Sequence, residues 1–238
     1  MRMTPSLARR AAAELVGTAA LVAVVVGSGI QAVALSQDTG VRLLANSLAS
    51  ALGLALLIAL LGPISGGHLN PVVTLSDWWA RRGEDDAPGL RQVTAYTAAQ
   101  LVGAVIGALL AEAMFGRAPG TWSTQVRSDT HLLLGETVAT AGLVLVVEGL
   151  RRIGRSSLAP VAVGGYILAA IWFTSSGSFS NPAATIGRSF SDSFTGIAPG
   201  SLPGFVGAQL LGALLGIALA AVLYGRGEPN GPVRRREE

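Results

Sequence analysis

The sequence has no cysteine and no lysine among its 238 residues, and it has only two histidines. The absence of cysteine excludes disulfides, a thiolate nucleophile and a cysteine-ligated metal site. His68 and His131 are too few for a histidine-rich metal centre. We therefore predict no metal site. Charged residues are also sparse, at 13% of the chain, which is low for a soluble domain of this size.

Apolar residues are abundant, at 50% of the chain with a mean hydropathy of +0.54. Several apolar runs exceed the roughly 18 to 20 residues that a helix needs to cross a hydrocarbon core about 30 Å thick. The first run is too long for a cleaved signal peptide and lacks a small-residue cleavage site, so we interpret it as a retained span. The sequence predicts an all-α membrane protein with six transmembrane helices, at residues 11–35, 41–61, 92–115, 131–150, 158–173 and 202–224.

All 17 basic residues are arginine, and a net charge of +3 alone is compatible with nucleic-acid binding. Their positions argue against a nucleic-acid partner. Thirteen arginines precede the first predicted span or follow the second, fourth and sixth, whereas the other side has Arg42, Arg117, Arg127 and Arg188. The positive-inside rule therefore predicts that the N-terminal segment 1–10 and the C-terminal tail 226–238 are both cytoplasmic.

The chain contains an internal repeat. AELVGTAALV at residues 13–22 resembles GETVATAGLV at residues 135–144, and AQLVG at 99–103 resembles AQLLG at 208–212. Each half, 11–115 and 131–225, has three predicted spans, so the second half must be inverted relative to the first. The channel-like domain at 11–225 is thus an inverted repeat, as in membrane transport proteins with a midplane site.

An Asn-Pro pair follows the second span in SGGHLNPVVTL and the fifth span in SSGSFSNPAATI. Asparagine caps free amide groups and proline suits the first helical position, so a helix is expected to begin at each pair. About ten residues of helix cover roughly 15 Å, half of the hydrocarbon thickness. Non-helical backbone at that depth is tolerated where it is buried or lines a water-filled cavity. The two segments therefore predict half-helices that meet at a pore, with the Asn70 and Asn181 carboxamides as donors.

These paired motifs resemble those of the aquaporin and aquaglyceroporin family, the major intrinsic proteins, over nearly the whole chain. The resemblance implies an hourglass-shaped pore without a cofactor, in a homotetramer in the plasma or bacterial inner membrane. It assigns the pore centre to Asn70, Pro71, Val72, Asn181, Pro182 and Ala183. It also implies that the intramembrane carboxylates of Glu14 and Glu136 brace the two loops, and that His68 is packed and hydrogen-bonded there.

The sequence departs from the family pattern in both motifs. Val72 stands where the family usually has alanine, and Ala184 stands where it usually has arginine. Family spacing places the other positions of the outer selectivity filter at Ser50, Ser178 and Ala169, with Trp172 as the alternative to Ala169. The outer filter is therefore expected to be wide and mildly polar.

Arg188 lies four residues beyond Ala184, on the same helical face. Two interpretations stay open at this point. Arg188 either replaces the missing cation at the mouth or forms an ion pair with Asp192 at the membrane surface.

The leading hypothesis is a passive channel for water and small uncharged solutes such as glycerol, urea or arsenous acid. Through its altered second motif, the chain also resembles bacterial family members associated with arsenic detoxification. The alternative is a secondary transporter, which inverted repeats and broken helices also fit. The predicted pore centre offers asparagines rather than ionisable groups that bind a driving ion, which favours the channel. No nucleophile, base and orienting group occur together there, so we do not expect an enzyme.

Overall fold

The computed structural model describes residues 5–84 and 87–225. Within these residues, six helical segments are long and apolar enough to span a membrane, as predicted. They are α1 (Leu7–Leu35), α2 (Thr39–Ser65), α4 (Leu90–Met114), α5 (Thr130–Arg152), α6 (Ala159–Phe173) with the preceding one-turn helix η1 (Ser156–Leu158), and α8 (Leu202–Tyr224) after η2 (Pro199–Ser201). The predicted tail at 226–238 and residues 1–4 of the predicted N-terminal segment lie outside the described residues.

Several helices extend beyond their predicted ends. α1 begins at Leu7 rather than 11, because Ser6 Oγ accepts a hydrogen bond from Arg9 N at 3.3 Å and caps the helix. α2 continues through Pro63 to its last residue, four residues past the predicted end at 61. Its last turn is closed by Gly66, which has φ of 96° and donates its N–H to Gly62 O at 3.0 Å.

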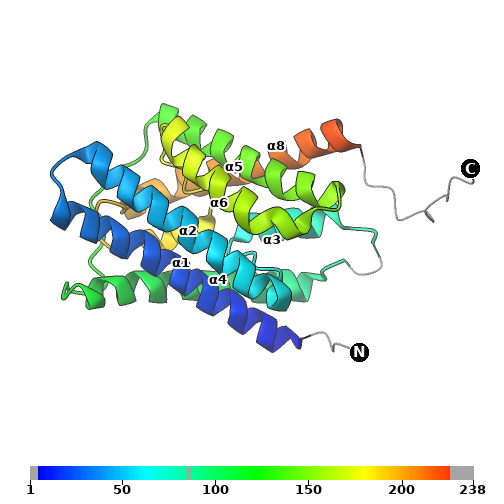
Figure 1. Cartoon of the computed structure of the whole chain (residues 1–238), viewed down its shortest axis with the longest axis horizontal. Helices are drawn as coiled ribbons and strands as arrows, with labels where there is room; N and C mark the ends of the chain where they lie inside the picture. The colour runs from blue at the N-terminus through cyan, green and yellow to red at the C-terminus, as the bar shows by residue number, and fades with distance from the viewer. Residues whose placement is uncertain (1–4, 85–86, 226–238) are drawn as a thin grey trace, which may run out of the picture.

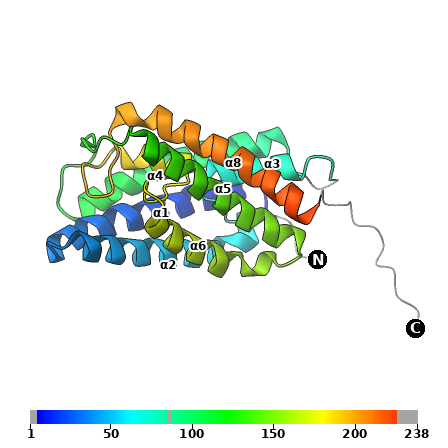
Figure 2. The ribbon, with the colours of Figure 1, turned by 90° about the horizontal axis from the view of Figure 1, so that it is seen from above.

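The long helices lie alongside one another, with the start of α1 and the end of α8 at the same end of the bundle (Figure 1). α1 packs on α4 and α2, and in the same way α5 packs on α8 and α6. Figure 2 shows α5 and α8 side by side along one flank of the bundle. The two halves thus repeat one arrangement of helices.

Glycines allow the closest of these helix crossings. A Cβ atom on Gly103 or Gly107 of α4 would lie under 3.0 Å from backbone oxygens of α1, those of Leu15 and Ala19. A Cβ atom on Gly212 or Gly216 of α8 would likewise lie under 3.0 Å from a backbone oxygen of α5, that of Thr137 or Ala141. The two pairs occupy matching positions in the repeat, and in both halves they let two backbones come into contact.

A short helix follows the second span of each half, α3 (Pro71–Ala80) in the first and α7 (Pro182–Arg188) in the second. Both begin at the predicted prolines. α3 has the expected ten residues, whereas α7 has seven and is shorter than the expected length of about ten. The chain beyond α7 runs through 189–198 without helix before η2 begins.

Candidate functional site

The two asparagines cap the short helices. Asn70 Oδ1 accepts a hydrogen bond from Val72 N at 3.0 Å, and Asn181 Oδ1 accepts from Ala183 N at 3.0 Å and Ala184 N at 3.2 Å. Each cap satisfies amide groups that the first helical turn leaves free. This use of the oxygen fixes the orientation of each carboxamide and turns its nitrogen away from the helix.

The two carboxamide nitrogens connect the motifs to each other. Asn70 Nδ2 donates to Ser180 O at 2.7 Å, and Asn181 Nδ2 donates to Leu69 O at 2.8 Å. The residues that supply these oxygens directly precede the asparagines, and both adopt left-handed backbone, with φ of 51° for Leu69 and 47° for Ser180. Such conformations are uncommon for residues other than glycine, and surrounding contacts must hold them in place. The amino ends of α3 and α7 therefore meet, with both carboxamides between them.

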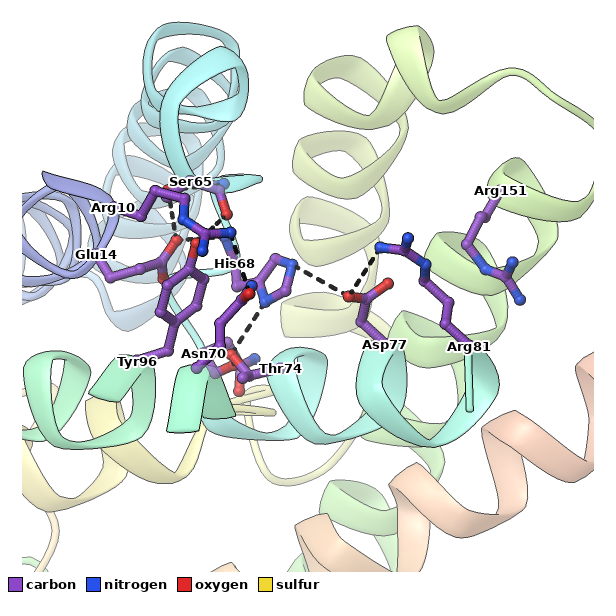
Figure 3. Close-up of polar contacts among 12 residues, drawn as sticks. Arg10, Glu14, Ser65, His68, Asn70, Thr74, Asp77, Arg81, Tyr96 and Arg151 are labelled. Carbon is purple, nitrogen blue, oxygen red and sulfur yellow. Dashed lines mark hydrogen bonds and ion pairs between the residues drawn. The ribbon is translucent and has the colours of Figure 1, made fainter. Parts of the chain in front are cut away.

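Glu14 braces the loop before α3. Its carboxylate is fully buried and accepts hydrogen bonds from the backbone N–H groups of His68 at 3.0 Å and Leu69 at 2.6 Å. Ser65 Oγ at 2.6 Å and Gln100 Nε2 at 2.8 Å complete its partners. Figure 3 shows Glu14 beside Ser65 and close to the segment that leads to Asn70. A buried carboxylate needs such donors, and here they hold the extended approach to the helix.

Glu136 occupies the equivalent place in the second half. It is fully buried and accepts from the backbone N–H groups of Phe179, at 3.2 Å, and Ser180. Gln209 Nε2 donates to the same carboxylate at 3.2 Å. The structure therefore places both glutamates against the loops that the sequence assigned to them.

Two glutamines and two threonines belong to the same framework but were missed by sequence reasoning. Gln100 Nε2 donates to Thr74 Oγ1 at 3.0 Å, and Gln209 Nε2 donates to Thr185 Oγ1 at 2.8 Å. Both threonine hydroxyls donate in turn to the backbone oxygen of the asparagine four residues earlier. The signal was present, because the glutamines lie in the repeated AQLVG and AQLLG segments and a threonine follows each Asn-Pro pair at the same spacing.

A cavity of about 560 Å³ passes the two asparagines. It is lined on the α3 side by His68, Asp77 and Arg151, and on the α7 side by Arg127 and Arg188 among others. Apolar side chains of the long helices line the rest, including Leu21, Val25, Leu54, Leu143, Val147 and Ile167. A passage with a few polar groups along apolar walls suits the orientation and transfer of small polar molecules.

The other residues of the predicted pore centre face away from this cavity. Val72 is fully buried against Val144 and Ala213, so its bulk does not enter the passage. Its neighbour Val73 lines the cavity instead. Pro71, Pro182 and Ala183 are buried in the short helices and do not line the cavity.

Three of the predicted outer-filter positions line the cavity, namely Ser50, Ser178 and Ala184. Ala169 does not line it: this residue is exposed on the outside of α6, so its predicted place in the filter was wrong. Trp172, the alternative from α6, lines the cavity, and its Nε1 donates to Ser47 Oγ at 3.1 Å.

Arg188 lies on the cavity, and the structure has no ion pair between its guanidinium and Asp192. The residue is only 9% exposed, and its Nε donates to the backbone oxygen of Thr195. The guanidinium carbon lies 3.2 Å from the centre of the Phe179 ring. Asp192 instead accepts hydrogen bonds from Thr124 N at 2.9 Å and Thr124 Oγ1 at 3.0 Å. Of the two interpretations, the geometry favours a cation at the mouth.

A pair of residues at equivalent positions of the repeat lies at each end of the cavity: His68 and Asp77 at one end, and Phe179 and Arg188 at the other. On the α3 side, the His68 ring lies 3.1 Å from Thr74 Oγ1 through Nδ1 and 4.0 Å from Asp77 Oδ2 through Nε2, as Figure 3 shows. Phe179 and Arg188 are the corresponding positions on the α7 side, shifted by the same 111 residues as the asparagines. One mouth thus has a carboxylate where the other has a guanidinium.

The sequence matches the model of the family "Major intrinsic protein" over residues 1–187. It is 45% identical over 230 residues to Aquaglyceroporin AqpS of Rhizobium meliloti, covering 97% of this chain and 95% of that protein. It is 32% identical over 250 residues to the probable aquaporin AqpM of Archaeoglobus fulgidus, covering 93% of this chain and 98% of that protein. The X-ray structure of the aquaglyceroporin from Plasmodium falciparum has the same fold, with a TM-score of 0.69 at 21% identity over 93% of this chain and 96% of the other.

The family match covers most of the chain, and the similarity to AqpS extends over nearly all of both proteins. Members of this family are channels rather than enzymes or coupled transporters, which decides between the two hypotheses drawn from the sequence. The chain therefore belongs to the major intrinsic protein family and is a multi-pass membrane protein that forms a passive channel for water and small solutes.

Proposed function

We propose that this channel conducts neutral solutes larger than water, such as glycerol, urea or undissociated arsenous acid, together with water itself. The observation that supports this most is Ala184, a one-carbon side chain on the cavity wall where the family resemblance implies an arginine. Ser50 and Ser178 line the same region with small hydroxyl side chains. The relative AqpS is described as an aquaglyceroporin.

The pore centre supports selection by charge. Asn70 and Asn181 present amide donors, and the amino ends of α3 and α7 add partial positive charge beside them. Water and hydroxyl oxygens accept from such donors, whereas a cation is repelled by them. Amide donors together with two helix amino ends therefore suit the passive passage of uncharged solutes.

We further propose a homotetramer in a plasma or bacterial inner membrane, with both termini in the cytoplasm. The arginine distribution supports this orientation, and α1 begins at the same end of the bundle at which α8 ends (Figure 1). α2 exposes a row of leucines suited to lipid or to another subunit, namely Leu44, Leu48, Leu52, Leu56 and Leu60. The repeat units 11–115 and 131–225 correspond to the two halves of one channel domain.

The test is reconstitution into liposomes, followed by vesicle shrinkage and re-swelling in separate gradients of water, glycerol, urea and arsenous acid. The proposal predicts rapid water flux and measurable flux of glycerol or arsenous acid above protein-free vesicles. Rapid water flux with exclusion of both larger solutes would overturn the wide-filter proposal.

Arg188→Ala in the same vesicles tests whether this residue acts as the filter cation. We expect a changed ratio of glycerol to water permeability, because the guanidinium lines the cavity near Ala184. Arg42→Ala is the matched control: Arg42 lies outside the cavity and donates its Nε to Ser36 O at 2.7 Å. An unchanged ratio in Arg188→Ala would assign Arg188 a purely structural role.

A further inference from the structure

The loop between α4 and α5 lies against the segment that follows α7. Ser123 N donates to Ser189 O at 2.9 Å, and Ala198 N donates to Gln125 O at 2.7 Å. Each of these bonds joins the loop at 116–129 to the segment at 189–198. Both segments are thereby held at the α7 mouth of the cavity.

Arg127 comes from this loop and reaches the cavity wall. Its backbone N–H donates to Ser201 Oγ at 2.9 Å, and its Nε donates to Gly196 O at 2.9 Å. These bonds hold the backbone and the Nε atom of Arg127 in place. Burial lowers the pKa of the Arg127 guanidinium from its usual value, yet an arginine remains protonated in proteins.

Arg127 and Arg188 share one aromatic ring. The Arg127 guanidinium carbon lies 5.3 Å from the centre of the Phe179 ring, and that of Arg188 lies 3.2 Å from it. Guanidinium groups stack on aromatic faces, so the ring helps to position both cations. Across residues 5–84 and 87–225, neither arginine takes part in an ion pair with a carboxylate.

Donors remain free on both groups. A guanidinium has five N–H donors. Arg188 uses Nε for Thr195, and its Nη groups have no acceptor in the described part of the chain and are not fully enclosed. Arg127 uses Nε and contacts Phe194 O through Nη2 at 3.4 Å, which leaves its Nη1 donors without an acceptor among the described residues. The mouth therefore presents free donors from two directions.

We infer that Arg127 is a second specificity-determining residue of this mouth and acts together with Arg188 on entering solutes. This inference rests on the proposed conduction of neutral solutes. A solute with two or three oxygens can accept from both guanidinium groups at once and so replace the water that it loses on entry. A water molecule needs fewer such contacts, and a cation is repelled by both charges. Arg127 thus favours oxygen-rich neutral solutes over water and excludes cations.

The chain has no cysteine, so Arg127→Cys introduces one unique thiol for chemical modification. In reconstituted vesicles we expect this variant to lower glycerol permeability about fivefold, the effect of losing one hydrogen bond, with a smaller change for water. Modification with 2-aminoethyl methanethiosulfonate returns a positively charged donor to the mouth, and glycerol permeability is expected to recover in part. The uncharged methyl methanethiosulfonate is expected to give no recovery.

Arg42→Cys is the matched control, because it removes one arginine from the same side of the membrane outside the cavity. We expect neither the substitution nor the modification at position 42 to change the glycerol to water ratio. Arg127→Lys provides a second variant that retains the charge. It is expected to keep proton and cation leak low while glycerol permeability falls, because lysine lacks the planar fork of donors.

The outcomes separate this inference from the proposed function. If the channel without substitutions conducts none of the larger solutes, the proposed function fails and the inference fails with it. The inference alone is wrong if the channel without substitutions conducts glycerol but the reagents do not react with the thiol of the Arg127→Cys variant. It is also wrong if Arg127→Cys and Arg127→Lys both keep the ratio of glycerol to water permeability of the channel without substitutions. Equal loss of water and glycerol flux in both variants would overturn it as well, since that result assigns Arg127 to holding the loop.

Discussion

Asn70 and Asn181 each use both ends of one carboxamide. The oxygen caps a short helix, and one Nδ2 hydrogen bonds to the backbone of the opposite loop. A carboxamide has two Nδ2 hydrogens, so one remains on each asparagine for a passing oxygen. Because the cap alone contributes about 1 kcal/mol, substitution of either residue affects folding as well as flux.

Ala184→Arg tests the proposed width of the filter at a single residue. The new side chain enters the cavity next to Asn181, so we expect glycerol permeability to fall about tenfold, as a barrier increase of about 1.4 kcal/mol produces, with a smaller loss for water. Stopped-flow light scattering on reconstituted vesicles measures both rates. Ala184→Leu adds bulk without charge and separates width from electrostatics. A glycerol to water ratio unchanged by both substitutions would place position 184 outside the constriction.

At the residue scale, the sequence predicted which side chains gather at the site better than which way they face. Asn70 and Asn181 followed from the Asn-Pro motifs, and the places of Glu14 and Glu136 followed from the family resemblance. Val72 was expected at the pore centre, but successive helical residues are rotated by about 100°, so its neighbour Val73 faces the cavity instead. A motif gives a position along the chain, whereas the facing direction depends on how the helix packs.

At the element scale, the two halves are alike in their helix crossings and unlike in their half-helices. α7 has seven residues against ten in α3, about 10 Å against 15 Å of helix. The shorter helix ends at Arg188, and the chain that follows supplies Thr195 and the other backbone groups that hold the mouth. The difference in length therefore leaves room on the α7 side for the non-helical backbone that contacts Arg188.

Gly107→Ala tests the close crossing of α1 and α4. The added Cβ would lie under 3.0 Å from Ala19 O, and such overpacking typically costs about 1 to 3 kcal/mol. We expect a lower yield of folded protein and a lower thermal midpoint in detergent, measured by fluorescence-detected size exclusion after heating. Gly165→Ala is the control, because a Cβ there meets no atom within 4 Å and the substitution is expected to be neutral or stabilising. Equal behaviour of the two variants would contradict the crossing.

The sequence predicted the elements well where they are periodic or repeated. All six spans and both helix starts were predicted from apolar length and from the Asn-Pro pairs. The loop at 116–129 has neither feature, so Arg127 was counted only as one of the arginines on its side. Its role at the mouth depends on hydrogen bonds to Gly196 and Ser201, which lie 69 and 74 residues away and which no local pattern indicates.

At the scale of the whole molecule, an inverted repeat gives two mouths of similar geometry with different side chains at equivalent positions. Asp77 lies beside His68 at one mouth, and Arg188 lies beside Phe179 at the other. The shared framework of Glu14 and Glu136 leaves these positions free to differ. An inverted repeat can therefore keep one structural core while each face of the membrane meets different charges.

The proposed orientation can be tested with single cysteines in the naturally cysteine-free chain. Arg42 lies near the start of α2, and the exposed Arg155 lies in the turn after α5. The arginine distribution predicts that Arg42→Cys reacts with a membrane-impermeant maleimide added to intact cells, while Arg155→Cys reacts only after permeabilisation. The reverse pattern would invert the proposed topology, and labelling is read as a mass shift of the purified protein.

The central claim is that two short helices meet by their amino ends inside the membrane and hold a polar passage open. An experimental structure of the purified channel in lipid nanodiscs tests it most directly. The account predicts that Asn70 Nδ2 lies within hydrogen-bond distance of Ser180 O, and Asn181 Nδ2 within that distance of Leu69 O, midway through the lipid layer. Carboxamides that do not reach the opposite loop, or an Asn-Pro pair located among the lipid headgroups, would contradict it.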